Sequence, residues 1–190
     1  MLKLDAAELV ALLGDGSFRD AHGILEKVLT IHPTSPPLRQ GFAGRARLRG
    51  TIEITRSEVE MVTGAPKAEL VKNILESLVE KDLEKGLRAI QTAGEANADM
   101  KLFARLILER LRFLFLLRLK AGMDDYIAKQ VSEDDFKYLK DLALKAPPDL
   151  TSNTLLKFIE AYENSGRTSI PELALELALS DSLHTTPLHT

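Results

Sequence analysis

Apolar residues recur every three or four positions along most of the chain, which is the spacing that places them on one face of an α-helix. The clearest stretch is AELVKNILESLVEKD, residues 68–82, and its apolar face consists of Leu70, Val71, Ile74, Leu75, Leu78 and Val79. The same period continues over residues 82–93, with Leu83, Leu87 and Ile90 on one face. Gly94 follows, where glycine commonly ends a helix. The pattern predicts two successive amphipathic helices.

Further helices are predicted over residues 5–13, 97–121, 123–129 and 133–145, and the helix at 97–121 is expected to be the most buried. Two capping boxes, Ser17 to Asp20 and Thr55 to Glu58, open two more. The first of these has Ile24, Leu25 and Val28 as its apolar stripe, and the second ends at Gly64 after about eight residues.

The segment APPDLTSN, residues 146–153, breaks the helical pattern, because consecutive prolines cannot continue a helix. Thr151 is expected to cap the next helix, and Pro171 to start the last one in the first-turn position that proline tolerates. The inward residues expected in the helix after Thr151 are Leu155, Leu156, Ile159 and Tyr162.

Only GTIEIT, residues 50–55, alternates as a strand does. The chain is therefore predicted to be all-α. A small helical unit covers residues 1–65, a larger helical bundle covers residues 66–184, and residues 185–190 form a frayed tail.

The composition is that of an ordinary soluble protein, with 45% hydrophobic and 28% charged residues in 190. No cysteine is present, which excludes disulfides, thiolate metal sites and cysteine nucleophiles. Without a signal peptide at the start, a cytoplasmic location is expected. Residues 102–120 are strongly apolar but contain six charged side chains, and their apolar run is shorter than the roughly 18 residues that a membrane span requires. No membrane contact is predicted.

Residues 33–50, PTSPPLRQGFAGRARLRG, contain three prolines, three glycines and no acid. Their four arginines, Arg39, Arg45, Arg47 and Arg49, suit contacts with the phosphates of a nucleic acid. The simpler reading is a solvated insertion in a surface loop. The simpler reading is favoured because Phe42 is the only aromatic residue available to stack on bases.

No catalytic constellation is evident. The phosphate-loop motif G-x-x-x-x-G-K-[ST] is absent, and the four histidines are too scattered to suggest a metal site. The acid pairs Asp124–Asp125 and Asp134–Asp135 lie where helices begin, so helix capping explains them.

Arg19 is the unusual residue, because it follows the cap Ser17 by two positions and a cation is disfavoured at the positive end of a helix. One reading is a weak surface pair with Asp20. The other is a phosphate-binding site formed by the Arg19 guanidinium together with the N-terminus of the helix.

The segment GDGSFRDAHGILEKVL, residues 14–29, resembles the lid-domain signature of the bacterial DNA polymerase III gamma/tau subunit, the AAA+ ATPase of the sliding-clamp loader. ITRSEVEMVTG resembles the short helix that ends the lid of this family. Residues 69–120 resemble the start of its collar domain, and residues 148–183 resemble the last two collar helices.

This resemblance implies that Arg19 is the sensor-2 arginine, which reaches the terminal phosphate of bound ATP. Gly16 and Ser17 match the turn and cap that set up its helix, and Asp20 matches a supporting position. The phosphate loop, Walker B acid, zinc-binding cysteines and arginine finger of the family belong to a preceding ATPase domain. We therefore expect Met1 to begin inside the lid, and this chain alone to bind no cofactor.

Three functions follow as hypotheses. The first is a clamp-loader fragment in DNA replication: its collar would assemble with other loader or polymerase III subunits, it would meet DNA only indirectly or weakly, and its Arg19 would contact ATP on a separate ATPase domain. The second is a helical interaction module with no nucleotide role. The third is a nucleic-acid-binding protein that uses the basic segment.

Overall fold

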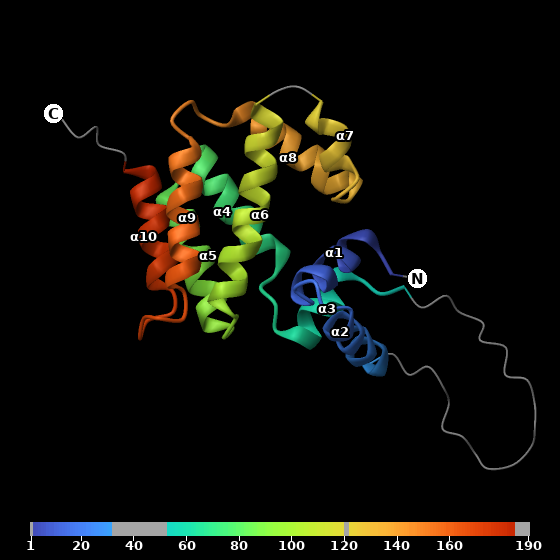
Figure 1. Ribbon diagram of the computed structural model, residues 1–190. Helices are drawn as coiled ribbons and strands as arrows, with labels where there is room; N and C mark the ends of the chain where they lie inside the picture. The colour runs from blue at the N-terminus through green and yellow to red at the C-terminus, as the bar shows by residue number, and fades with distance from the viewer. Residues whose placement is uncertain (1, 32–52, 120–121, 185–190) are drawn as a thin grey trace, which may run out of the picture. The chain divides into compact units, whose positions relative to one another are not determined.

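A computed structural model describes residues 2–31, 53–119 and 122–184. These residues form ten α-helices, which confirms the all-α prediction. The chain divides into two compact units, residues 1–63 and 64–190 (Figure 1). The division lies two residues before the boundary predicted from sequence.

The first unit contains α1 (Leu4–Leu13), α2 (Phe18–Ile31) and α3 (Arg56–Thr63), which pack on one another. The strand-like segment contributes one isolated parallel bridge, between Leu2 and Ile54. Among the described residues of this unit, the buried apolar side chains are Ala6, Leu9, Val10, Val28, Ile54 and Val59. Of the stripe predicted for α2, only Val28 is fully buried, so this helix is lightly anchored.

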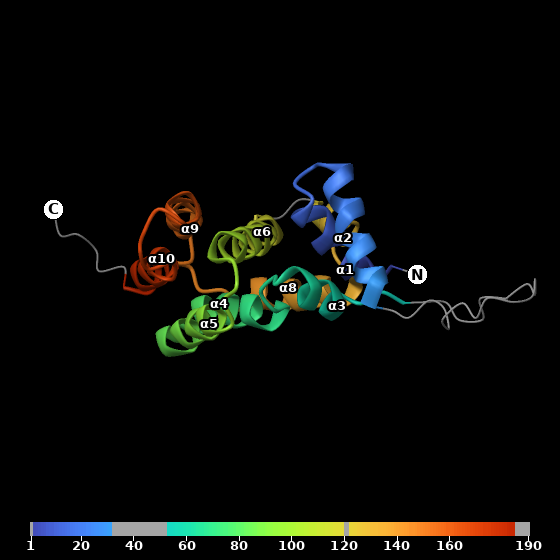
Figure 2. The same cartoon turned by 90° about the horizontal axis from the view of Figure 1, so that it is seen from below.

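The described part of the second unit contains seven helices. They are α4 (Ala68–Glu80), α5 (Leu83–Glu95), α6 (Met100–Arg118), α7 (Met123–Ala128), α8 (Glu133–Lys145), α9 (Ser152–Asn164) and α10 (Leu173–Leu183). In Figures 1 and 2, α4 lies beside α5 and α9 beside α10, while α6 packs against α9, α8 and α4. Among the described residues, no helix has the length and apolar character needed to cross a bilayer.

α6 is the most buried helix, as predicted, with nine buried residues. It is shorter than the predicted span of residues 97–121, because Asp99 caps it. The Asp99 carboxylate accepts the N–H groups of Lys101 and Leu102 at 2.9 and 3.0 Å, so the helical residues start at Met100. The helix ends at Arg118.

Two predicted helix boundaries, the end of α5 and the start of α10, are each wrong by two residues. α5 continues to Glu95, so Gly94 lies inside its last turn. α10 begins at Leu173, and Pro171 lies in the turn before it. The Leu173 N–H donates to the Ile170 oxygen in a tight turn, and regular helical bonding starts at the Glu172 carbonyl, which accepts the Glu176 N–H at 3.1 Å.

The structure buries a different face of α9 from the predicted one. Thr154, Phe158 and Ala161 are buried, whereas Leu156 and Ile159, which were predicted to face inward, are 60% and 38% exposed. Apolar residues occur on more than one face of this helix, so the spacing alone indicates the wrong face. The packing of α9 against α6 and α10 decides which face is covered.

Candidate functional site

The turn between α1 and α2 positions the segment that contains Arg19. After Gly14, the residues Asp15 and Gly16 have φ angles of 46° and 81°, a left-handed conformation that favours glycine. The Ser17 N–H then donates to the Gly14 oxygen at 2.7 Å, which closes the turn. A Cβ atom at Gly14 would lie 3.0 Å from the Ala21 Cβ, so a glycine here lets α2 pass close to the end of α1.

Ser17 caps α2 through one hydrogen bond. Its Oγ accepts the Asp20 N–H at 3.2 Å, whereas its own N–H is used in the preceding turn. The Asp20 carboxylate therefore does not complete the reciprocal half of the predicted box. In the other predicted capping box, the acidic side chain does bond back to the cap residue. The Glu58 carboxylate accepts both the N–H and the hydroxyl of Thr55, at 2.7 and 2.8 Å.

Arg19 is the second residue of α2, and its side chain is exposed. Within the part of the chain that the structure describes, its guanidinium forms no hydrogen bond and no ion pair, so the surface pair with Asp20 is not formed. A cation in this position costs about 0.3–1 kcal/mol against the helix dipole. Its five N–H donors are directed to solvent at the positive end of the helix, an arrangement suited to an anion.

Phe18, which precedes Arg19, is 94% exposed. The first turn of α2 therefore presents an aromatic ring next to a guanidinium, and both residue types are enriched at protein interfaces. Sequence reasoning did not single out Phe18. The feature of the sequence that could have indicated its exposure is its position directly after the cap Ser17. At this position of the first turn, the side chain does not point toward α1 or α3.

The four arginines of the basic segment, at positions 39, 45, 47 and 49, lie outside the described residues, as does the tail at 185–190.

A second polar cluster joins α4, α6 and α8 in the second unit. The Asp135 carboxylate pairs with Lys72 of α4 at 3.0 Å and with Arg110 of α6 at 3.6 Å, and the Arg110 side chain is only 9% exposed. Asp135 lies in the first turn of α8, where its charge was predicted to favour the helix start, but its side chain does not form the cap. Ser132 caps α8, because its Oγ accepts the Asp135 N–H at 3.2 Å. Asp135 instead links three helices through its side chain.

Tyr138 extends this cluster toward α5. Its hydroxyl lies 3.3 Å from Glu76 Oε1, and the Lys72 ammonium lies 4.9 Å from the centre of its ring. Burial, followed by the charge of Glu76, raises the pKa of Tyr138 well above its usual range. Glu76 also pairs with Lys85 at 2.5 Å. The cluster connects helices and exposes no reactive group, so we interpret its role as structural.

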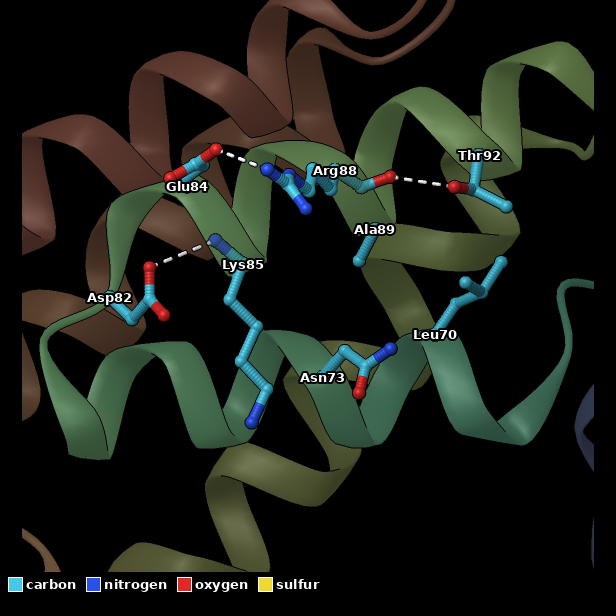
Figure 3. Close-up of a pocket in the computed structure, with 8 residues that line it drawn as sticks. All are labelled: Leu70, Asn73, Asp82, Glu84, Lys85, Arg88, Ala89 and Thr92. Atoms are coloured by element: carbon cyan, nitrogen blue, oxygen red, sulfur yellow. Dashed lines mark hydrogen bonds and ion pairs between the residues drawn. The ribbon is translucent and has the colours of Figure 1, made fainter.

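A cleft of about 400 Å³ lies between α4 and α5 and is lined by Lys85, Arg88 and six other residues (Figure 3). Its cations are paired with acids. Lys85 contacts Glu76 and Glu80, which raises the lysine pKa mainly through the Glu76 hydrogen bond, and Arg88 pairs with Glu84. Because these charges satisfy one another, the cleft is a weaker candidate for an anion site than the start of α2.

Among the described residues, no group of three or more His, Asp or Glu side chains has an arrangement that could hold a metal ion. Comparison of the sequence with known protein families and with curated proteins finds no match to either.

Proposed function

We propose that this chain is a subunit, or part of a subunit, of the bacterial DNA polymerase III clamp loader. The resemblance of the GSFRDA segment to the lid signature of that family is the basis of the proposal. The single observation that supports it best is the display of Arg19, exposed and without an acidic partner among the described residues, in the first turn of a serine-capped helix.

Arg19 would act on a nucleotide held elsewhere. The chain lacks a phosphate-loop motif, so ATP would be bound by a separate ATPase domain. The guanidinium and the first free N–H groups of α2 would contact the terminal phosphate of that ATP. Gly16 and Ser17 would set the position of this helix end, and Asp20 would supply the N–H that the cap holds.

The second unit would provide assembly. Its helices occur in the order that the collar resemblance predicts, with a long buried helix, α6, before the last helix pair. In this role the unit would pack against other loader or polymerase III subunits, while the first unit reports the nucleotide state.

The first experiment is affinity purification of the tagged chain from its own cells, with identification of bound proteins by mass spectrometry. Recovery of clamp-loader or polymerase subunits, in particular a separate ATPase protein, is the expected result. Recovery of no replication protein by the folded chain would count against the proposal.

The second experiment combines the chain with that ATPase protein and measures the ATP dependence of assembly. Arg19→Ala should weaken the effect of ATP about tenfold or more, the loss expected for a charge-assisted hydrogen bond. Lys27→Ala is the matched control, because it removes the same charge from an exposed site further along α2. Equal behaviour of the two variants would refute the sensor role.

A helical interaction module without a nucleotide role is the alternative. Exposed apolar side chains on the last two helices, Leu156, Ile159 and Leu177, favour some protein contact. This alternative predicts the same assembly with or without ATP, and an Arg19→Ala variant that assembles normally.

A further inference from the structure

An apolar groove lies where α6 ends and α9 begins. It has a volume of about 480 Å³. Its apolar wall is formed by Phe115 and Leu116 of α6, by Leu119 directly after α6, and by Leu150 and Leu155 on the side of α9. All of these residues belong to the second unit, so the groove is complete within one compact body.

The apolar surface of the groove is open and continues along α9. Leu119 is 76% exposed. Ile159 lies one helical turn beyond Leu155 and is 38% exposed, and the neighbouring Leu156 is 60% exposed. These α9 residues belong to the stripe whose spacing predicts burial, yet no described part of the chain covers them. A continuous apolar surface of this kind is typical of a binding site for another protein segment.

Two arginines border the groove and have no acidic partner among the described residues. The Arg112 guanidinium donates to the Tyr126 hydroxyl at 3.5 Å. Arg118 donates to the Pro147 oxygen at 3.2 Å and to the Leu150 oxygen. These bonds to neutral carbonyls hold the guanidinium in place without cancelling its charge.

The groove has no acid among its lining residues, whereas two lysines elsewhere in the unit are paired with acids at short distances. Lys81 contacts Asp149 at 2.5 Å, and Lys140 contacts Asp124 at 2.6 Å. The nearest acid in the α8–α9 connection, Asp149, is thus already paired. In a chain with a net charge of −3, the groove combines an apolar floor with a positive rim.

We propose that this groove binds an amphipathic segment of another protein, with apolar residues on one face and Asp or Glu beside them. The apolar face would lie against Phe115, Leu119 and Leu155, and the acids would pair with Arg112 and Arg118. An apolar floor of this size argues against a small anion, and the unpaired guanidinium groups argue for an acidic segment over a neutral or basic one. The held Arg118 needs little further ordering on binding. This site does not rest on the proposed role of Arg19.

The test starts with a library of random peptides of about 16 residues, long enough for a helix with anchors at i, i+4 and i+7, displayed and selected on the full chain. Enriched peptides should carry apolar residues at that spacing with a clear excess of Asp and Glu. A labelled peptide from the selection is then titrated with the chain, and binding is followed by fluorescence anisotropy. The same peptide with its acids replaced by lysine should not bind.

Two variants locate the site. Leu119→Ser and Arg112→Glu should each raise the Kd of the peptide about tenfold or more, which corresponds to the loss of one anchor. The controls are Leu144→Ser, at an 82% exposed leucine of α8 outside the groove, and Arg167→Glu, an equal charge change in an exposed loop. Both controls should leave the Kd within about twofold. All four positions are exposed, and circular dichroism is used to check that each variant is folded.

The proposal is overturned if no peptide is enriched, if the enriched peptides lack the excess of acids, or if the groove variants and the controls bind equally. Two further results would identify a different occupant and overturn it as well. One is self-association in analytical ultracentrifugation that Leu119→Ser abolishes and the peptide does not compete. The other is flotation of the chain with phosphatidylserine vesicles that depends on Leu119 and is unaffected by the peptide.

Discussion

Replacement of Gly86 by alanine tests how closely α5 packs against α10. A Cβ atom at Gly86 would lie 2.5 Å from Leu179 Cδ2 and 2.6 Å from Ser77 Oγ, well inside van der Waals contact. Leu179 and Ser77 are fully buried, and the Ser77 hydroxyl donates to the Ile74 oxygen at 2.7 Å. Neither neighbour can therefore move aside into solvent.

Two opposing effects set the size of the change. Alanine is favoured over glycine inside a helix by about 1 kcal/mol. Extra volume in a packed core costs about 1–3 kcal/mol. We expect Gly86→Ala to lower the free energy of unfolding by about 1 kcal/mol. Gly94→Ala in the same helix is the matched control, because the group that its Cβ would meet is the carboxylate end of the half-buried Glu172, which can rotate away. This control should be neutral or slightly stabilising.

Urea unfolding followed by tyrosine fluorescence measures the change in the free energy of unfolding of the second unit, which contains Gly86. The chain has no tryptophan, and its three tyrosines, Tyr126, Tyr138 and Tyr162, all lie in the second unit. Leu179→Ala alone should cost about 2–5 kcal/mol. In that background Gly86→Ala should cost clearly less than in the wild type, because the Leu179 methyl groups are gone and only the contact with Ser77 Oγ remains. An equal cost in both backgrounds, or stabilisation of the wild type, would refute the reasoning.

Two further predictions concern the polar cluster of the second unit. Asp135→Ala should lower the free energy of unfolding by about 2–3 kcal/mol, because it removes an acid paired with a buried arginine, whereas the exposed neighbour Asp134→Ala should change it by less than about 0.5 kcal/mol. If the two variants lower the free energy of unfolding by similar amounts in urea, the proposed stabilising role of Asp135 is wrong. In an ultraviolet absorbance titration, Tyr126 should ionise first, because hydrogen bonding, chiefly with Gln130, lowers its pKa, and Tyr138 should ionise last, because burial raises its pKa. Tyr138→Phe should remove the step at the highest pH, and loss of the first step instead would contradict the assignment.

The sequence alone was enough to predict the all-α class and the approximate place of most helices, because both depend on neighbours within one or two turns. Ser132 and Thr151 cap α8 and α9 by accepting N–H groups two or three residues further along. The place of Arg19 in the first turn of α2 follows from the same local rule, since Ser17 accepts an N–H three residues away.

Only the tertiary structure decided which side chains meet across helices. α9 has apolar residues on more than one face, and its contacts with α6 and α10 bury Phe158 and leave Leu156 exposed. Asp135 resembles a capping acid in sequence, but its partners come from α4 and α6. In the sequence, Gly86 is only a weak helix former. In the structure, Leu179 of α10 fills the space beside it and leaves no room for a Cβ atom. Each of these outcomes depends on residues distant in the chain, because burial and ion pairing depend on what covers a helix face and not on the helix alone.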